Sequence, residues 1–170
     1  DFLHLSGPNG VWNRVGGISK AGKGVVIGML DSGIWPESKS FAGAKLGSAP
    51  DPANPTKAYR QGSDIVMHKA DGQTFTGTCQ AGPAFPAATC NTKIISARFY
   101  GENFLASLAT PGDISPQEYL SPRDGEGHGT HTSSTAAGNN GVHAVVEGND
   151  FGFISGVAPA DAIGGHEARR

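Results

Sequence analysis

The sequence is short of several features that would point to other classes of protein. Its 170 residues hold only two cysteines, and no apolar run approaches the roughly 20 residues that a membrane-spanning helix needs. The 13 basic and 15 acidic residues give a net charge of −2 without a basic tract, which argues against nucleic acid as a partner. The opening "DFLHLSGPNG" lacks the charged and apolar regions of a signal peptide. We therefore expect a mature, soluble chain with no membrane or nucleic-acid partner.

Glycine and proline, by contrast, are plentiful. The 26 glycines and 11 prolines make the composition rich in turns, although it stays below the roughly 25–30% of such residues that is typical of disorder. The length suits one domain. We therefore expect a single domain in which loops make up much of the chain.

The two cysteines, Cys79 and Cys90, lie eleven residues apart in "GTCQAGPAFPAATC". Glycine and proline between them favour a chain that folds back on itself. No histidine or further cysteine lies nearby to complete a four-ligand metal set, so a small disulfide loop is favoured over a metal pair. A disulfide suits an oxidising, secreted setting.

Three short apolar stretches predict strands. Residues 24–30, "GVVIGML", are typical of a strand buried on both faces in a parallel sheet, with Asp31 at its carboxyl end. Residues 93–99 predict a second strand, and residues 151–158 a turn followed by a third. The polar, proline-rich residues 36–92 are too long for a structureless loop, so we expect short elements, turns and the disulfide there.

The stretch "GHGTHTSSTAAG" from Gly127 predicts a helix of about three turns. Its side chains are small, so the helix can pack closely against a sheet. It runs into "AGNNG", where Asn139 and Asn140 are interpreted as a left-handed helix cap.

Two histidines at the start of this helix, His128 and His131, lie three residues apart and so on one helical face. The zinc-protease signature needs a spacing of four and a glutamate after the first histidine, which disfavours a metal pair. Two solvated polar residues would be the ordinary interpretation. However, Gly127 and Gly129 leave the imidazole of His128 accessible, as a general base requires.

Asp31 follows a predicted strand in "VVIGMLDSGIW". It is interpreted either as a turn-starting residue or as an acid of a catalytic site. Asp-Ser-Gly after an apolar run is also found in aspartic proteases, which need two such carboxylates. Asp71 and Asp124 lack a preceding hydrophobic strand, so that interpretation would need a symmetric dimer.

Together, Asp31 and His128 supply two of the three residues of an Asp/His/Ser relay, in which the carboxylate orients the imidazole that deprotonates a serine. Their order along the chain is one of those known for this relay. The sequence resembles the subtilisin-like serine proteases (subtilases, peptidase family S8), in particular the plant and bacterial branch, over nearly the whole chain to about residue 160. The stretches that carry the resemblance are residues 25–41, 121–138 and 155–161, with residues 77–100, cysteine pair included, similar to the connecting region of that branch.

The resemblance implies an α/β fold with a doubly wound, mostly parallel sheet and helices on both faces. It implies that Asp31 is the relay acid, that His128 is the base and that His131 is structural. It implies polypeptide substrates and no organic cofactor. Several subtilases bind calcium just after the histidine helix; here Glu147, Asn149 and Asp150 offer oxygen ligands, although a solvated acidic loop is the favoured interpretation.

The family's nucleophilic serine segment and oxyanion asparagine find no match in these 170 residues. Ser133 and Ser134 lie on the helix of His128 but not on its face. Residues 161–170, "DAIGGHEARR", depart from the family pattern and are too polar and glycine-rich for a core strand. We therefore expect residues 1–170 to be a truncated amino-terminal portion of the catalytic domain, inactive alone, whose missing carboxy-terminal part is a potential partner.

Two alternatives stay open at this point. One is a non-catalytic remnant that binds peptides without turnover. The other is a dimeric aspartic-type protease that uses Asp31.

Overall fold

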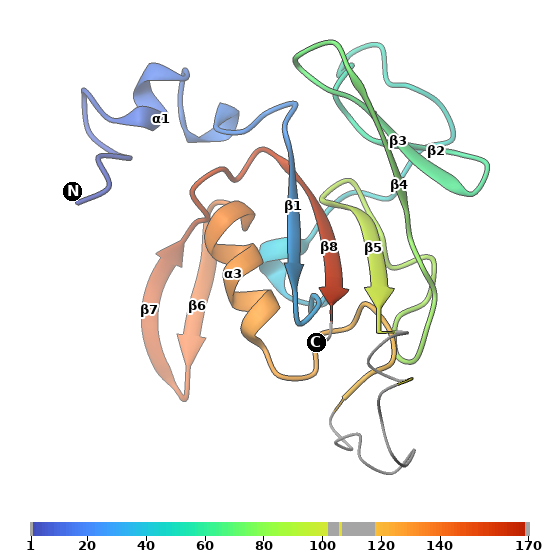
Figure 1. The fold of residues 1–170 in the computed structure, drawn as a ribbon. Helices are drawn as coiled ribbons and strands as arrows, with labels where there is room; N and C mark the ends of the chain where they lie inside the picture. Colours follow the sequence, from blue (N-terminus) through green and yellow to red (C-terminus); the bar gives the residue numbers. More distant parts are fainter. Residues whose placement is uncertain (1, 102–105, 107–117, 169–170) are drawn as a thin grey trace.

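The centre of the structure is a small parallel sheet with a helix beside it. The computed structural model describes residues 2–101, 106 and 118–168 (Figure 1). Strands β1 (Val26–Asp31), β8 (Ala162–Ala168) and β5 (Ile94–Tyr100) form this sheet in the order β1-β8-β5. Helix α3 (His128–Ala137) packs against β1 and β8. The predicted α/β class with a parallel sheet is confirmed.

Strand β1 lies close to its predicted place, but it is not buried on both faces. Its residues alternate between half-buried and exposed, and Leu30 is 69% exposed. The reason is its position at the edge of the three-stranded sheet, where only β8 pairs with it. The prediction of residues 93–99 as a strand agrees with β5 to within one residue at each end.

The prediction that residues 161–170 are too polar for a core strand was wrong. Residues 162–168 form β8, the central strand of the parallel sheet, which pairs with β1 on one side and β5 on the other. Backbone hydrogen bonds on both edges do not depend on apolar side chains. Gly165 also leaves space for Ile34, which would lie only 3.4 Å from a Cβ at that position.

The third predicted strand was misplaced. Strand β7 (Asn149–Ile154) pairs antiparallel with β6 (Val142–Val146) in a hairpin, and no strand covers residues 155–158. Glu147 and Gly148 take left-handed backbone angles at the turn, which suits a tight two-residue hairpin. The apolar residues at 151–154 therefore belong to a peripheral hairpin and not to the central sheet.

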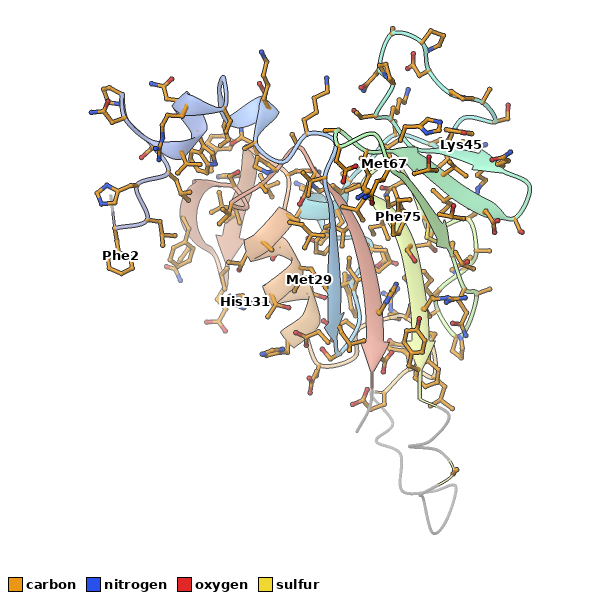
Figure 2. The ribbon with its side chains drawn as sticks, turned by 45° about the horizontal axis from the view of Figure 1, so that its top comes forward. Phe2, Met29, Lys45, Met67, Phe75 and His131 are labelled. Atoms are coloured by element: carbon orange, nitrogen blue, oxygen red, sulfur yellow. A yellow bond between two sulfur atoms is a disulfide. The ribbon has the colours of Figure 1, made fainter. Side chains whose placement is uncertain are left out.

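Residues 36–92 hold the short elements that their length predicts. A second, antiparallel sheet joins β2 (Tyr59–Gln61), β3 (Asp64–His68) and β4 (Thr74–Thr78), after the 3-10 turn η2 (Lys39–Phe41). Cys79 and Cys90 form the predicted disulfide, with an S–S distance of 2.01 Å. Figure 2 labels Met67 and Phe75 on the second sheet; the first belongs to the main core and the second packs against it.

The hydrophobic core lies where the two sheets meet. Its largest fully buried apolar side chains are Ile34, Phe41, Ile65, Phe85, Ile94, Ile95 and Ile163. The chain begins with a short helix, α1 (Val11–Arg14), and a 3-10 turn, η1 (Ile18–Lys20). Within the described residues, no helix has the length and apolar character to cross a lipid bilayer.

Candidate active site

Asp31 and His128, the two residues singled out in the sequence, meet in space although 97 residues separate them. Asp31 ends strand β1 and His128 begins helix α3, and these two ends lie side by side (Figure 1). The His128 Nδ1 lies 2.7 Å from the Asp31 Oδ1. The imidazole is 66% exposed and the carboxylate only 18%. An ionised carboxylate only accepts, so Nδ1 carries the proton of this hydrogen bond, and in the neutral ring Nε2 is then the nitrogen that can accept a proton.

Three donors hold the carboxylate of Asp31. His128 Nδ1 and the backbone N–H of Ser32, at 2.8 Å, both donate to Oδ1, while Thr132 Oγ1 donates to Oδ2 at 2.9 Å. Burial alone would raise the pKa of Asp31, but these hydrogen bonds outweigh it and lower the pKa below its ordinary value. In turn, the hydrogen bond to Asp31 and its negative charge raise the pKa of His128.

Glycines let the strand end and the helix start approach each other. A Cβ at Gly129 would lie 2.3 Å from the carbonyl oxygen of Gly33, so only glycine fits at this contact. Gly127, before the first helical residue, has a φ of 96°, a left-handed conformation that glycine adopts readily. The glycines around His128 thus do more than expose its imidazole, because they also bring it to Asp31.

Asp124 anchors this junction and was not recognised from the sequence as a site residue. Its carboxylate is fully buried and accepts hydrogen bonds from five donors. One donor is the hydroxyl of Ser32, which lies 3.0 Å from Asp124 Oδ1. The Ser32 hydroxyl oxygen in turn accepts from the backbone N–H of Gly129 at 2.8 Å. Burial raises the pKa of Asp124, but the donors outweigh it and hold the pKa below its ordinary value. An acid shortly before a helix is a known capping signal and would have been the clue.

The neighbouring Arg123 joins the segment before α3 to the one after β1. Its Nη1 donates to the Glu37 carboxylate at 2.9 Å and to the Ala84 carbonyl oxygen at 2.9 Å. Its guanidinium lies 4.0 Å from the ring centroid of Trp35, a cation–π contact. The backbone N–H of Trp35 donates to Thr130 Oγ1 on α3. These contacts add to the support of the junction between β1 and α3.

The other polar residues of the helix do not join the pair. His131 is exposed on α3 (Figure 2), and its carbonyl oxygen accepts from the hydroxyl of Ser134. Ser133 is fully buried. Among the described residues, no serine hydroxyl forms a hydrogen bond with the imidazole of His128. The part of the chain that the structure describes therefore brings together an acid and a base, with no serine hydroxyl bonded to the base.

The prediction that Asn139 and Asn140 form a left-handed cap was wrong. Gly138, which ends the helix, has a φ of −59° and an extended conformation, and the left-handed residue stands at the other end of α3. The Asn139 side chain donates to the carbonyl oxygens of Lys39 and Ala42. It therefore ties the end of α3 to the turn η2.

The three residues that offer oxygen ligands for calcium, Glu147, Asn149 and Asp150, lie on the β6-β7 hairpin. Asp150 Oδ1 accepts from His143 Nε2 at 2.9 Å and from the Gly152 N–H at 2.7 Å, so local donors already engage this carboxylate. In the described part of the chain, no three acidic, histidine or cysteine side chains gather in a group that could hold a metal ion. No step of the chemistry below depends on calcium.

Comparisons with known proteins agree on one family. Residues 22–168 match the model described as the subtilase family of peptidases S8. The subtilisin-like protease SBT2.2 of Arabidopsis thaliana is 41% identical over 162 residues, which are 95% of this chain and 16% of that protein. From the same plant, SBT2.4 is 39% identical over 170 residues, covering 99% of this chain and 18% of the relative. SBT1.6 is 38% identical over 167 residues, which are 98% of this chain and 18% of that relative.

The matched region contains both Asp31 and His128 and continues through strand β8. The chain spans less than a fifth of the length of these relatives. The family match nevertheless covers most of the chain, and the parallel sheet and the junction between β1 and α3 lie within it. The chain belongs to the subtilase family of serine-type peptidases.

Proposed function

We propose that this chain supplies the acid and the base of a subtilisin-like serine endopeptidase. The observation that carries the proposal is the 2.7 Å hydrogen bond between His128 Nδ1 and Asp31, which directs the opposite ring nitrogen away from the carboxylate. In this role, neutral His128 takes the proton of a serine hydroxyl through Nε2 as the serine oxygen attacks the peptide carbonyl. Asp31 stabilises the imidazolium, which then protonates the leaving amine to give an acyl-enzyme and, after attack by water, the free enzyme.

The nucleophile in this proposal comes from a segment outside residues 1–170. Ser133 is buried and the Ser134 hydroxyl donates to a helix carbonyl, so neither is arranged for attack. The chain covers only 16–18% of the relatives, which leaves ample length for a serine segment in a parent protein. We expect the 170-residue chain to be inactive alone, because removing the serine of such a relay costs about 10⁶ in turnover.

The same contacts favour the serine-type reaction over the aspartic-type one. An aspartic protease shares one proton between two carboxylates, which raises the pKa of one of them. Asp31 faces an imidazole, a hydroxyl and a backbone N–H, and its pKa is lowered. We propose polypeptides as substrates, in line with the names of the relatives. The disulfide supports a secreted setting.

Activity-based labelling tests the proposal. The 170-residue chain and the parent polypeptide are each treated with a fluorophosphonate probe and incubated with a fluorogenic peptide. We expect the parent to be labelled at a serine outside residues 1–170 and to cleave the peptide, and the chain alone to do neither. His128→Gln in the parent should abolish labelling. Inhibition by a statine-type compound, or labelling of Ser133 or Ser134, would contradict the assignment.

Peptide titration of the 170-residue chain examines the remaining alternative. Saturable binding of peptides, together with a parent polypeptide that shows no labelling and no cleavage, would identify a binding remnant instead of a protease.

A further inference from the structure

Helix α3 directs two side chains at the same carboxylate. His128 and Thr132 are four residues apart, so they lie on one face of the helix. His128 Nδ1 reaches Asp31 Oδ1 at 2.7 Å, and Thr132 Oγ1 reaches Asp31 Oδ2 at 2.9 Å. The backbone N–H of Ser32 also donates to Oδ1. Within the described residues, Thr132 is thus the only hydrogen-bond donor to Oδ2.

The hydroxyl of Thr132 has two acceptors for one proton. Besides Asp31 Oδ2, the carbonyl oxygen of Gly129 lies 3.1 Å from Thr132 Oγ1. An ionised carboxylate is the stronger acceptor, because a hydrogen bond to a charged group is roughly twice as strong as a neutral one. The carbonyl oxygen three residues back is the usual local alternative for a helical threonine. The direction of this O–H bond therefore depends on the charge of Asp31.

We propose that Thr132 is a positioning residue of the relay, which holds the second oxygen of Asp31 so that the first stays turned toward His128; this rests on the proposed function. The terminal torsion of an aspartate is soft, so a carboxylate bound through only one oxygen rotates easily. Donors on both oxygens fix its plane. A fixed acceptor in turn fixes the tautomer and the orientation of the imidazole, which leaves Nε2 aimed at the nucleophile.

NMR on the 170-residue chain tests the positioning role without any catalytic turnover. Thr132→Val removes the hydroxyl at nearly constant shape, and Thr132→Ser keeps the hydroxyl. Thr135→Val is the matched control, because Thr135 lies on the same helix and its hydroxyl donates to the His131 carbonyl oxygen. We expect Thr132→Val to raise the Asp31 pKa, followed at its carboxyl ¹³C, and to broaden the His128 Nδ1 proton signal. In Thr132→Ser and in Thr135→Val, the Asp31 pKa and the His128 Nδ1 proton signal should both stay as they are in the unmutated chain.

A measurement on the unmutated chain guards against a variant that fails to fold. As Asp31 takes up a proton, the Thr132 hydroxyl should turn to Gly129. The ¹³Cβ signal of Thr132 should then titrate with the same midpoint as the carboxyl carbon of Asp31. A Thr132 signal that ignores the titration of Asp31 would overturn the proposal. So would an unchanged Asp31 midpoint in folded Thr132→Val.

Kinetics of the parent protease separate this inference from the proposed function. There, Thr132→Val should lower kcat about ten-fold at unchanged KM, as expected from the loss of one hydrogen bond to a charged group. Thr132→Ser should recover most of the loss. If the NMR changes occur but the parent has no peptidase activity, the positioning role stands and the proposed function fails. If the parent is active and Thr132→Val keeps full kcat, the positioning role fails alone.

Discussion

Replacing Asp124 by asparagine should destabilise the junction that holds the proposed relay together. The carboxylate accepts from the Ser32 hydroxyl and the backbone N–H groups of Glu126 and Gly127 through Oδ1, and from the backbone N–H and hydroxyl of Thr130 through Oδ2. An asparagine oxygen can still serve the first three donors. Its NH₂ group then faces the two groups of Thr130, of which only the hydroxyl can rotate to accept.

The magnitude follows from this count. One buried backbone N–H loses its acceptor, which costs about 1–3 kcal/mol, and the remaining bonds lose the strengthening by charge. A total of about 3 kcal/mol is a large part of the 5–15 kcal/mol that stabilises a typical domain. With a urea m-value of about 2 kcal/mol per molar, the unfolding midpoint should fall by about 1.5 M.

Urea unfolding, followed by far-ultraviolet circular dichroism, measures this shift. Asp64→Asn is the control, because Asp64 is only half-buried and accepts a single long hydrogen bond of 3.4 Å from Ser63. That change should stay within about 0.5 kcal/mol. A midpoint for Asp124→Asn that is no lower than the midpoint for Asp64→Asn would refute the anchoring role of Asp124.

The pH dependence of stability gives an independent check on Asp124. Its pKa in the folded chain is lowered, so its contribution is fully present above the ordinary value of 3.8 and is lost as the pH falls through the folded pKa. The stability gap between the unmutated chain and Asp124→Asn should therefore be constant near neutral pH and shrink below 3.8. A stability difference that widens in acid would contradict the lowered pKa of Asp124 in the folded chain.

Two further changes test the supports of the site. Gly129→Ala should destabilise the chain by about 1–3 kcal/mol, because the added Cβ overpacks against Gly33. Gly47→Ala is the control and should have a far smaller effect, because its added Cβ meets its nearest atom at 3.7 Å. Equal urea unfolding midpoints for the two variants would contradict the close contact. Replacing Cys79 and Cys90 by serine opens a loop closed across eleven residues, and by loop entropy this should cost about 3 kcal/mol in urea unfolding. If reduction of the unmutated chain leaves its unfolding midpoint unchanged, that estimate fails.

Local sequence patterns predicted the elements whose signals are local. The β-branched run before Asp31 and the small residues after His128 located β1 and α3, because β-branched residues favour a strand and small residues let a helix pack closely. Strand β8 was not predicted, because its position depends on pairing with β1 and β5 on its two edges. Its polar and glycine residues give no sign of this pairing. The β6-β7 hairpin was missed although Glu147 and Gly148 carry a turn signal.

The candidate site divides in the same way. Asp31 and His128 could be predicted, because each stands where an element ends or begins and the pair has a known order along the chain. The roles of Ser32, Asp124 and Thr132 depend on contacts between segments about 90 to 100 residues apart. No local pattern reports such contacts, and only Asp124 has a local clue as well, its place shortly before helix α3.

The central claim is that Asp31 orients the imidazole of His128 and stabilises its protonated form. The most direct measurement is a ¹⁵N NMR titration of His128 in the unmutated chain and in Asp31→Asn. We predict that the neutral ring carries its proton on Nδ1, and that its pKa falls in Asp31→Asn because the stabilising charge is gone. A proton on Nε2 in the unmutated chain, or the same midpoint in both proteins, would contradict the account.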